Sequence, residues 1–209
     1  MKIAVVASNG KASRAIVAEL IARGHEVTGF ARSENKSAAQ NFVQKDIMAL
    51  SKEDLAGFDA VVDGFGAYTP ETLPLHTQTS QHLADLVAGT ATRLYIVGGA
   101  GSLYVDAEHR VQLLDTPEFP AEFYPLAKAQ TEELAALRSR TDAKWVFVSP
   151  AADFRADGEK TGKYILGGEE LTLSGAGESI ISYADYAVGM VDLIESGAHI
   201  GERVSLVQA

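Results

Sequence analysis

The sequence predicts an α/β fold in which a doubly wound parallel sheet carries helices on both faces. Short apolar runs alternate with amphipathic helical segments along most of the chain. The chain begins, between Lys2 and Arg23, with a strand, a tight polar turn that holds one glycine, and a helix. The chain has 209 residues, of which 46% are hydrophobic, enough for one core but not for two. We therefore expect residues 1–209 to form a single domain.

Each predicted element follows from its apolar pattern. Residues 3–6 form a buried strand, and residues 13–23 form a helix with an inward apolar face that ends at Gly24. Further strands are predicted at 27–31, 42–43, 59–62, 94–97, 145–148 and 204–207. Further helices are predicted at about 76–87, 122–138 and 184–195. In such a sheet, ligands bind beyond the carboxyl ends of the strands.

Residues 153–182 differ in character from the rest of the chain. They are rich in Gly, Glu and Lys, and the short alternating runs at 164–166 and 171–173 predict small strands. We interpret this segment as a C-terminal excursion on the substrate side of the sheet. Ser182 is expected to cap the last helix, so that its neighbours are structural.

Composition excludes several classes of function. The formal net charge of -10 and the absence of a basic stripe argue against nucleic acid as a partner. The chain has no cysteine, so disulfides and thiolate chemistry are excluded, and its five histidines are scattered, so no metal site is predicted. No apolar run approaches the roughly 20 residues that span a bilayer. We expect a cytoplasmic protein without a membrane partner, either a monomer or a homodimer.

The opening turn has the order of a dinucleotide phosphate site. The first amides of a helix have no intrahelical partner and attract anions, so a diphosphate can lie where the turn meets the helix. A spaced-glycine fingerprint would place glycine at three positions, where this chain has Ala7, Gly10 and Ser13. The small residues at two of these positions still permit close approach. The residues expected to contact the diphosphate are Ser8, Asn9, Gly10, Lys11 and Ala12.

The end of the second strand bears on the choice between NAD and NADP. An acidic residue there binds the ribose hydroxyls of NAD, whereas a basic residue accommodates the 2′-phosphate of NADP. Here the strand ends in Arg32 and Ser33, which favours NADP, because a guanidinium forks onto phosphate. Glu34 leaves NAD open, since a slightly different loop would present its carboxylate instead.

Two further strand ends are placed to flank the cofactor. Asp46 and Ile47 follow the third strand, and Gly64, Phe65 and Gly66 follow the fourth. Glycines at such ends let the backbone approach a flat ligand. We expect these five residues beside the adenine and the middle of the dinucleotide.

Five sequence motifs resemble a known family over nearly the whole length. They are GGAGSL at 98–103, LLDTPEFPAE at 113–122, WVFVSPAADF at 145–154, GEKTGKY at 158–164 and ISYADYA at 181–187. They resemble the atypical short-chain dehydrogenase/reductase proteins described as NADH-flavin reductases and, more distantly, biliverdin reductase B and the NmrA-like proteins. The resemblance implies an NAD(P)-binding Rossmann fold and a reductase of flavins or quinones. That family opens with Gly-Ala-Thr-Gly, where this chain has Ala-Ser-Asn-Gly.

One pair of residues has the spacing of catalytic groups in true short-chain dehydrogenases. Tyr124 and Lys128 are four residues apart, so both side chains lie on one helix face, and Ser102 would hold the substrate oxygen. In that chemistry the ammonium lowers the tyrosine pKa, and the phenol passes a proton to a carbonyl. Pro125 places Tyr124 at the helix boundary, and the flavin-reductase-like family does not use such a pair. The Tyr-Lys spacing is therefore also consistent with chance.

Flavin reduction requires less from the protein, because stacked rings at reacting distance suffice and solvent can supply the proton. Phe65, Tyr68, Tyr104 and Phe154 follow strand ends and could form an aromatic platform. Pro150 and Ala151 are expected to close against the nicotinamide. The sequence thus predicts an NADPH-dependent reductase of flavin or quinone, with flavin as a substrate rather than a tightly bound cofactor. The alternatives are a carbonyl reductase that uses Ser102, Tyr124 and Lys128, and a non-enzymatic NADP-binding redox sensor.

Overall fold

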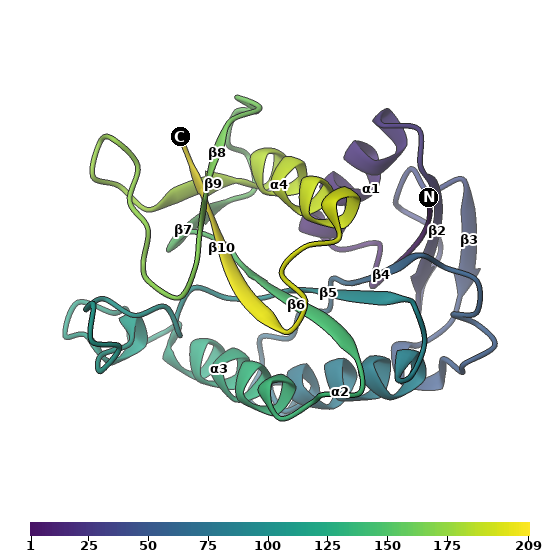
Figure 1. Cartoon of the computed structure of the whole chain (residues 1–209), viewed down its shortest axis with the longest axis horizontal. Helices are drawn as coiled ribbons and strands as arrows, with labels where there is room; N and C mark the ends of the chain where they lie inside the picture. The colour runs from purple at the N-terminus through teal and green to yellow at the C-terminus, as the bar shows by residue number, and fades with distance from the viewer.

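Apolar strands and helices alternate through most of the chain, and the computed structural model, which describes residues 1–209, shows their arrangement (Figure 1). The strands are β1 (Lys2–Val6), β2 (Glu26–Ala31), β3 (Asn41–Gln44), β4 (Ala60–Asp63), β5 (Arg93–Val97), β6 (Lys144–Ser149), β7 (Asp153–Arg155), β8 (Tyr164–Gly167), β9 (Ile180–Ser182) and β10 (Glu202–Gln208). The helices are α1 (Lys11–Ala22), α2 (Leu75–Val87), α3 (Tyr124–Arg138) and α4 (Tyr183–Ser196), with 3-10 turns at Ile47–Ala49 and Leu113–Asp115.

The central sheet has eight strands in the order β3-β2-β1-β4-β5-β6-β10-β8. All neighbouring strands are parallel except β8, which runs antiparallel to β10 at the edge. The predicted doubly wound fold is confirmed, with this one antiparallel strand as a departure. The chain order reverses between β1 and β4, and at such a switch point a doubly wound fold leaves a crevice for ligands.

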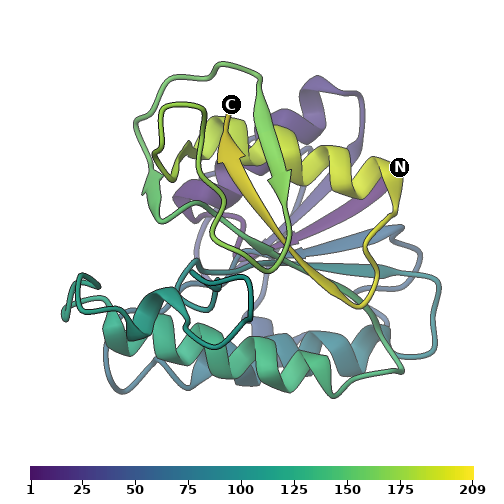
Figure 2. The ribbon, with the colours of Figure 1, turned by 60° about the vertical axis from the view of Figure 1, so that its left-hand side comes forward.

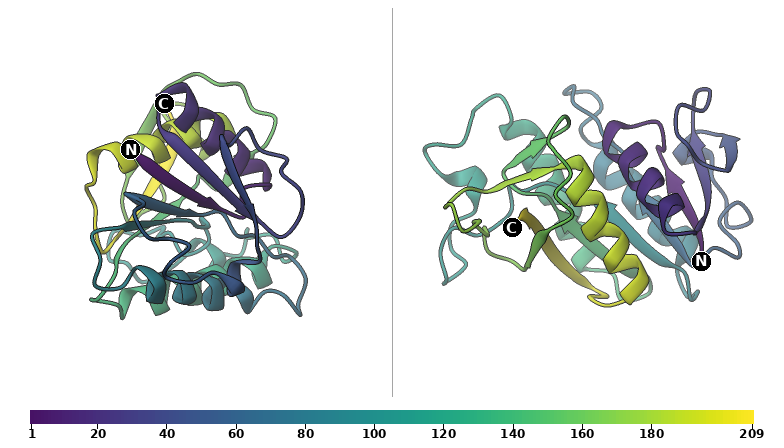
Figure 3. Two further views of the ribbon diagram at one scale, coloured as in Figure 1. Left: turned by 90° about the vertical axis from the view of Figure 1, so that its right-hand side faces the viewer. Right: turned by 90° about the horizontal axis from the view of Figure 1, so that it is seen from above.

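Two layers of helices cover the sheet. Helices α1 and α4 lie side by side on one face, and α2 and α3 cover the other (Figures 2 and 3). Successive side chains of a strand point to opposite faces, so Ala60 and Val62 of β4 join the core beneath α1 and α4, whereas Val61 joins the core above α2 and α3. No helix in the structure combines the length and the apolar character that crossing a membrane requires.

Local sequence explains where the helices begin and end. α1 begins at Lys11, two residues before the predicted start, and Gly24 follows it with a φ of 79°, as expected for a terminating glycine. α3 begins at Tyr124 rather than at residue 122, because Pro125 fits only the first turn of a helix. The Ser182 hydroxyl accepts a hydrogen bond from the Asp185 amide at 3.0 Å, which confirms the predicted cap of α4.

The C-terminal excursion was predicted only in part. The strand expected at 164–166 is β8, but it extends the main sheet. The prediction of a strand at 171–173 is wrong. This segment pairs with no other strand, and its one bond of this kind runs from the Leu171 amide to the Tyr104 carbonyl. In its place, β7 and β9 form a separate parallel pair. The Leu-Thr-Leu alternation predicts an extended segment with one apolar face, but it does not determine which strand pairs with that segment.

Candidate functional site

The turn between β1 and α1 presents free backbone donors at the carboxyl edge of the sheet. The Gly10 amide donates to the Ala7 carbonyl at 3.0 Å, and the Arg14 amide donates to the Gly10 carbonyl at 2.9 Å. The amides of Lys11, Ala12 and Ser13 have no partner in the chain, and no side chain caps α1. Free amides of this kind, at the positive end of a helix dipole, are groups that attract anions, and a phosphate contact here stays a prediction.

The residues before the free amides shape the turn. Ala7 has a φ of 53°, in the left-handed region where glycine is the usual residue. The Ser8 side chain is buried against the sheet, where its hydroxyl donates to the Phe30 carbonyl at 3.4 Å. Of the predicted contacts in the turn, Ser8 therefore supports the loop with its side chain, while Gly10 and Lys11 are exposed.

Close packing of α1 onto β4 depends on Gly64. A Cβ atom at Gly64 would overlap the Ser13 hydroxyl, which lies 3.5 Å from the Gly64 carbonyl oxygen. In a glycine fingerprint the third glycine provides this close approach from the helix side. In this chain Ser13 occupies the helix position, and the strand side supplies the glycine.

The loop after β2 lies against the turn, as the NADP prediction requires. Arg32 and Ser33 are exposed, and the Asn9 side chain donates to the Ser33 hydroxyl at 3.1 Å. Arg32 forms no ion pair, so its guanidinium is free to bind a ligand, and the Glu34 side chain has no hydrogen bond either. The structure thus brings Asn9 and Ser33 together, and Arg32 and Glu34 flank Ser33 in sequence.

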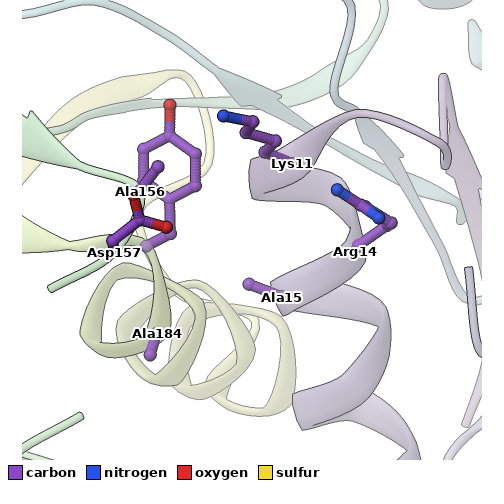
Figure 4. Close-up of a pocket in the computed structure, with 7 residues that line it drawn as sticks. Lys11, Arg14, Ala15, Ala156, Asp157 and Ala184 are labelled. Atoms are coloured by element: carbon purple, nitrogen blue, oxygen red, sulfur yellow. The ribbon is translucent and has the colours of Figure 1, made fainter. Parts of the chain in front are cut away.

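A cavity of about 380 Å³ opens beside the first turn of α1 (Figure 4). Lys11 and Arg14 project from α1 on one side, and Asp157 lies across from them (Figure 4). Tyr183 also lines the cavity, and its ring packs on Phe154 with centroids 4.1 Å apart. Neither Lys11 nor Arg14 forms an ion pair. Two unpaired cations beside free helix amides favour a phosphate-bearing ligand.

The other predicted cofactor residues line the same edge of the sheet. The Asp46 carboxylate accepts from the Met48 amide at 2.9 Å and so caps a 3-10 turn, while Ile47 is buried. Gly66 is exposed, and Phe65 packs edge-on against His76 with ring centroids 5.4 Å apart. Beyond β6, Pro150 and Ala151 are both buried.

A buried polar cluster lies behind the loop that follows β4. Asp63 is 1% exposed, one of its oxygens accepts from the Phe65 amide at 2.9 Å, and the other has no partner. Burial raises the pKa of Asp63 to about 6. Burial and the nearby Asp63 charge raise the pKa of Glu133, which lies 3.8 Å from the His76 ring. Burial lowers the pKa of His76, whose Nε2 is 3.1 Å from the Ala67 carbonyl.

The three candidate catalytic residues are not joined by hydrogen bonds. Ser102 is buried, and its carbonyl accepts from Arg203 at 3.2 Å. Tyr124 is 41% exposed in the first turn of α3, and Lys128 is exposed one turn later. Neither side chain forms a hydrogen bond with the other or with the Ser102 hydroxyl. Their catalytic role stays a prediction.

The predicted aromatic platform does not assemble. Each of three rings packs elsewhere: Phe65 on His76, Tyr104 on His109 with centroids 4.5 Å apart, and Phe154 on Tyr183 and Tyr186. Tyr68 is 77% exposed. These rings follow different strand ends, and sequence position alone does not show which of them turns toward the crevice.

Sequence reasoning missed several residues of this region. Arg14 and Tyr183 line the cavity, although Tyr183 was interpreted as part of a structural helix start. Arg14 carried a usable signal, because it lies three residues after Lys11 and so on the same face of the helix. Asp63 carried another, since a carboxylate directly after three buried apolar residues of a strand is costly unless it has a role.

Comparisons with known proteins agree with this geometry. The YwnB protein of Bacillus subtilis (strain 168), which is uncharacterised, is 41% identical over 210 residues, covering 99% of this chain and 98% of that protein. The crystal structure of a proposed NADH-flavin reductase from Streptococcus pneumoniae TIGR4 has a TM-score of 0.98 and 58% identity, with 100% of both chains covered. That of a proposed epimerase from Bacteroides thetaiotaomicron has a TM-score of 0.86 and 32% identity, covering 99% of this chain and 96% of that one.

The family comparison covers most of the fold. Residues 8–196 match the family described as NAD(P)H-binding, a span that runs from the turn before α1 to the end of α4. The match confirms the resemblance found in the sequence. The diphosphate of the NAD(P)H that the family's description names is an anion, and it suits the unpaired amides and cations at the carboxyl edge. The chain therefore belongs to the NAD(P)H-binding family, on a Rossmann fold.

Proposed function

We propose that this protein is an oxidoreductase that uses NADPH to reduce a flavin or a quinone. The observation that carries the proposal is the unpartnered amide run at residues 11–13, flanked by three cations without carboxylate partners: Lys11, Arg14 and Arg32. These groups would bind the diphosphate and the 2′-phosphate of the cofactor. When bound, the nicotinamide supplies a hydride.

The preference for NADPH over NADH rests on Arg32. Its guanidinium is exposed at the end of β2, and no acidic side chain neutralises it. A guanidinium binds a phosphate through two parallel hydrogen bonds but has no acceptor for a ribose hydroxyl. NADH use would instead require the Glu34 carboxylate to face the ribose.

Two observations support a flavin or quinone as the acceptor. The similar protein from Streptococcus pneumoniae is described as a proposed NADH-flavin reductase. In addition, the side chains of Tyr124 and Lys128 are exposed and make no hydrogen bonds, so nothing holds them as a proton donor for a carbonyl. Flavin and quinone reduction tolerate such a site, because solvent can protonate the reduced acceptor. Binding and orientation are then the main contributions of this chain.

The first experiment measures NADPH and NADH oxidation with FMN, riboflavin, menadione and a panel of aldehydes and ketones. We expect turnover with flavins or menadione, and a lower KM for NADPH than for NADH. Oxidation with carbonyls alone would contradict the proposed acceptor. Cofactor binding without oxidation of any acceptor would instead indicate a redox sensor.

An Arg32→Gln variant tests the cofactor assignment. Loss of a charge-assisted pair raises the KM for NADPH by about 10–100-fold and leaves that for NADH nearly unchanged. The matched control is Arg93→Gln, because Arg93 also lacks an ion pair but begins β5 at the opposite edge of the sheet. Equal losses for both cofactors, or an effect of the control, would contradict the role of Arg32.

A further inference from the structure

One side chain joins the two parts of the cofactor site, which come from segments more than 20 residues apart. The Asn9 Nδ2 atom donates to the Glu34 carbonyl at 2.8 Å, to the Ser33 hydroxyl at 3.1 Å and to the Ser33 carbonyl at 3.4 Å. Its Oδ1 atom accepts from the Lys36 amide at 2.8 Å. Asn9 thus bonds three of the four residues in the loop formed by residues 33–36, namely Ser33, Glu34 and Lys36.

These partners fix the orientation of the Asn9 amide. Carbonyl oxygens only accept and a backbone amide only donates, so exchanging Oδ1 and Nδ2 would break the bonds to Glu34 and Lys36 together. A residue with only an acceptor or only a donor cannot make both contacts. Asparagine is therefore suited to this position by chemistry as well as by size.

No other side chain of the opening turn holds this loop. The Ser8 hydroxyl bonds the Phe30 carbonyl, and Gly10 has no side chain. Within the loop, the Asn35 Oδ1 atom accepts only from Ser37, at 2.9 Å from the amide and 2.8 Å from the hydroxyl. Asn9 is consequently the side chain of the turn that holds Ser33 in place beside the free amides of α1.

We propose that Asn9 is a positioning residue that sets the choice between NADPH and NADH, by holding the loop after Arg32 at a fixed distance from the diphosphate turn. NADPH must satisfy both places at once, because its diphosphate and its 2′-phosphate are separated by one ribose. NADH lacks the 2′-phosphate and does not need the loop in a single position. The inference rests on the proposed NADP site but not on any acceptor.

Without Asn9, the loop would have to be ordered by the ligand itself, which reduces affinity. The affinity for NADPH is therefore reduced, because NADPH is the ligand that contacts the loop. A purely structural role for Asn9 would weaken both cofactors equally through the shared diphosphate. The NADPH-to-NADH affinity ratio therefore separates the two roles.

The test measures binding of 2′-phospho-ADP-ribose and of ADP-ribose by titration calorimetry, with no acceptor present. In Asn9→Ala we expect about 10-fold weaker binding of the 2′-phosphorylated probe and less than about a 3-fold change for ADP-ribose. Asn9→Asp keeps the acceptor for the Lys36 amide but loses the donors, so it is expected to lose the same selectivity. It also serves as the second variant if Asn9→Ala does not fold.

The matched control is Asn35→Ala, which removes an asparagine of the same loop that does not contact the turn. We expect it to retain more of the selectivity for the 2′-phosphorylated probe than either Asn9 variant. Equal weakening of both probes in the Asn9 variants would overturn the inference and leave NADPH use intact. If the unaltered protein binds ADP-ribose as tightly as its 2′-phosphorylated form, both the NADP assignment and the inference are wrong.

Discussion

The first half of the fold, around β1–β4, and the second half, around β5–β10, present their positive charge differently. At the carboxyl edge of the first half, Arg14 and Arg32 form no ion pair. In the second half, Arg138 of α3 and Arg203 of β10 both bind Glu169. The second half thus uses arginine to hold the segments around the excursion together. In a chain with a net charge of -10, anion binding depends on the few cations that are kept free of carboxylates.

The largest effect that we expect comes from the contact that forms the first half. Gly64→Ala would place a Cβ atom onto the Ser13 hydroxyl and push α1 off β4, destabilising the fold by about 3 kcal/mol. Urea denaturation measures the loss, and cofactor titration should show weaker binding, because the free amides move with α1. Adding Ser13→Ala removes the overlapping oxygen and should restore most of the stability. A double variant no more stable than Gly64→Ala would contradict this account.

The sequence predicts the fold well because the periodicity of apolar residues is a local property. The alternation of strands and helices, the stop at Gly24 and the cap at Ser182 all depend on neighbouring residues. The error at 171–173 and the separate β7–β9 pair depend on which distant segment supplies a partner strand. Local pattern predicts an element, but pairing is decided by the tertiary fold.

The candidate site divides in the same way. The turn before α1 and Arg32 at the end of β2 were predictable, because strand ends place them on one edge. The bonds from Asn9 to the 33–36 loop and the position of Tyr183 beside α1 were not, since they join segments far apart in the chain. Even the effect of Asp63 on Glu133 depends on the tertiary fold, because the two carboxyl groups come from β4 and α3.

The second prediction concerns the buried carboxyl groups where the two halves meet. Asp63, at the end of β4, has a folded pKa near 6 against 3.8 for the unperturbed group, so the folded state holds a proton that the unfolded state has lost. The free energy of unfolding should therefore fall as the pH rises from about 4 to 6. The raised pKa of Glu133 acts in the same direction. The lowered pKa of His76 acts in the opposite one, with stability rising toward pH 6.5.

Removing the buried charge should stabilise the protein above this range. Asp63→Asn keeps the acceptor for the Phe65 amide and should raise the free energy of unfolding by about 1–2 kcal/mol at pH 8, with little gain at pH 4.5. Urea denaturation at both pH values measures the difference. Asp115→Asn, at an exposed carboxylate without hydrogen bonds, is the control and should show no pH-dependent gain. An equal effect of Asp63→Asn at both pH values would argue against a deprotonation cost.

The smallest effect is expected in the second half, at Tyr124. If flavin reduction depends on the cofactor site of the first half and on solvent protons, Tyr124→Phe should change kcat and KM for NADPH and FMN by less than about 2-fold. Lys128→Gln, one turn later, should be equally silent. A catalytic Tyr-Lys pair would instead lose about 100-fold or more in kcat for a carbonyl substrate, because the phenol would be its proton donor. A loss of that size in flavin reduction would place the chemistry in the second half after all, with the free cations of the first half serving only to bind the cofactor.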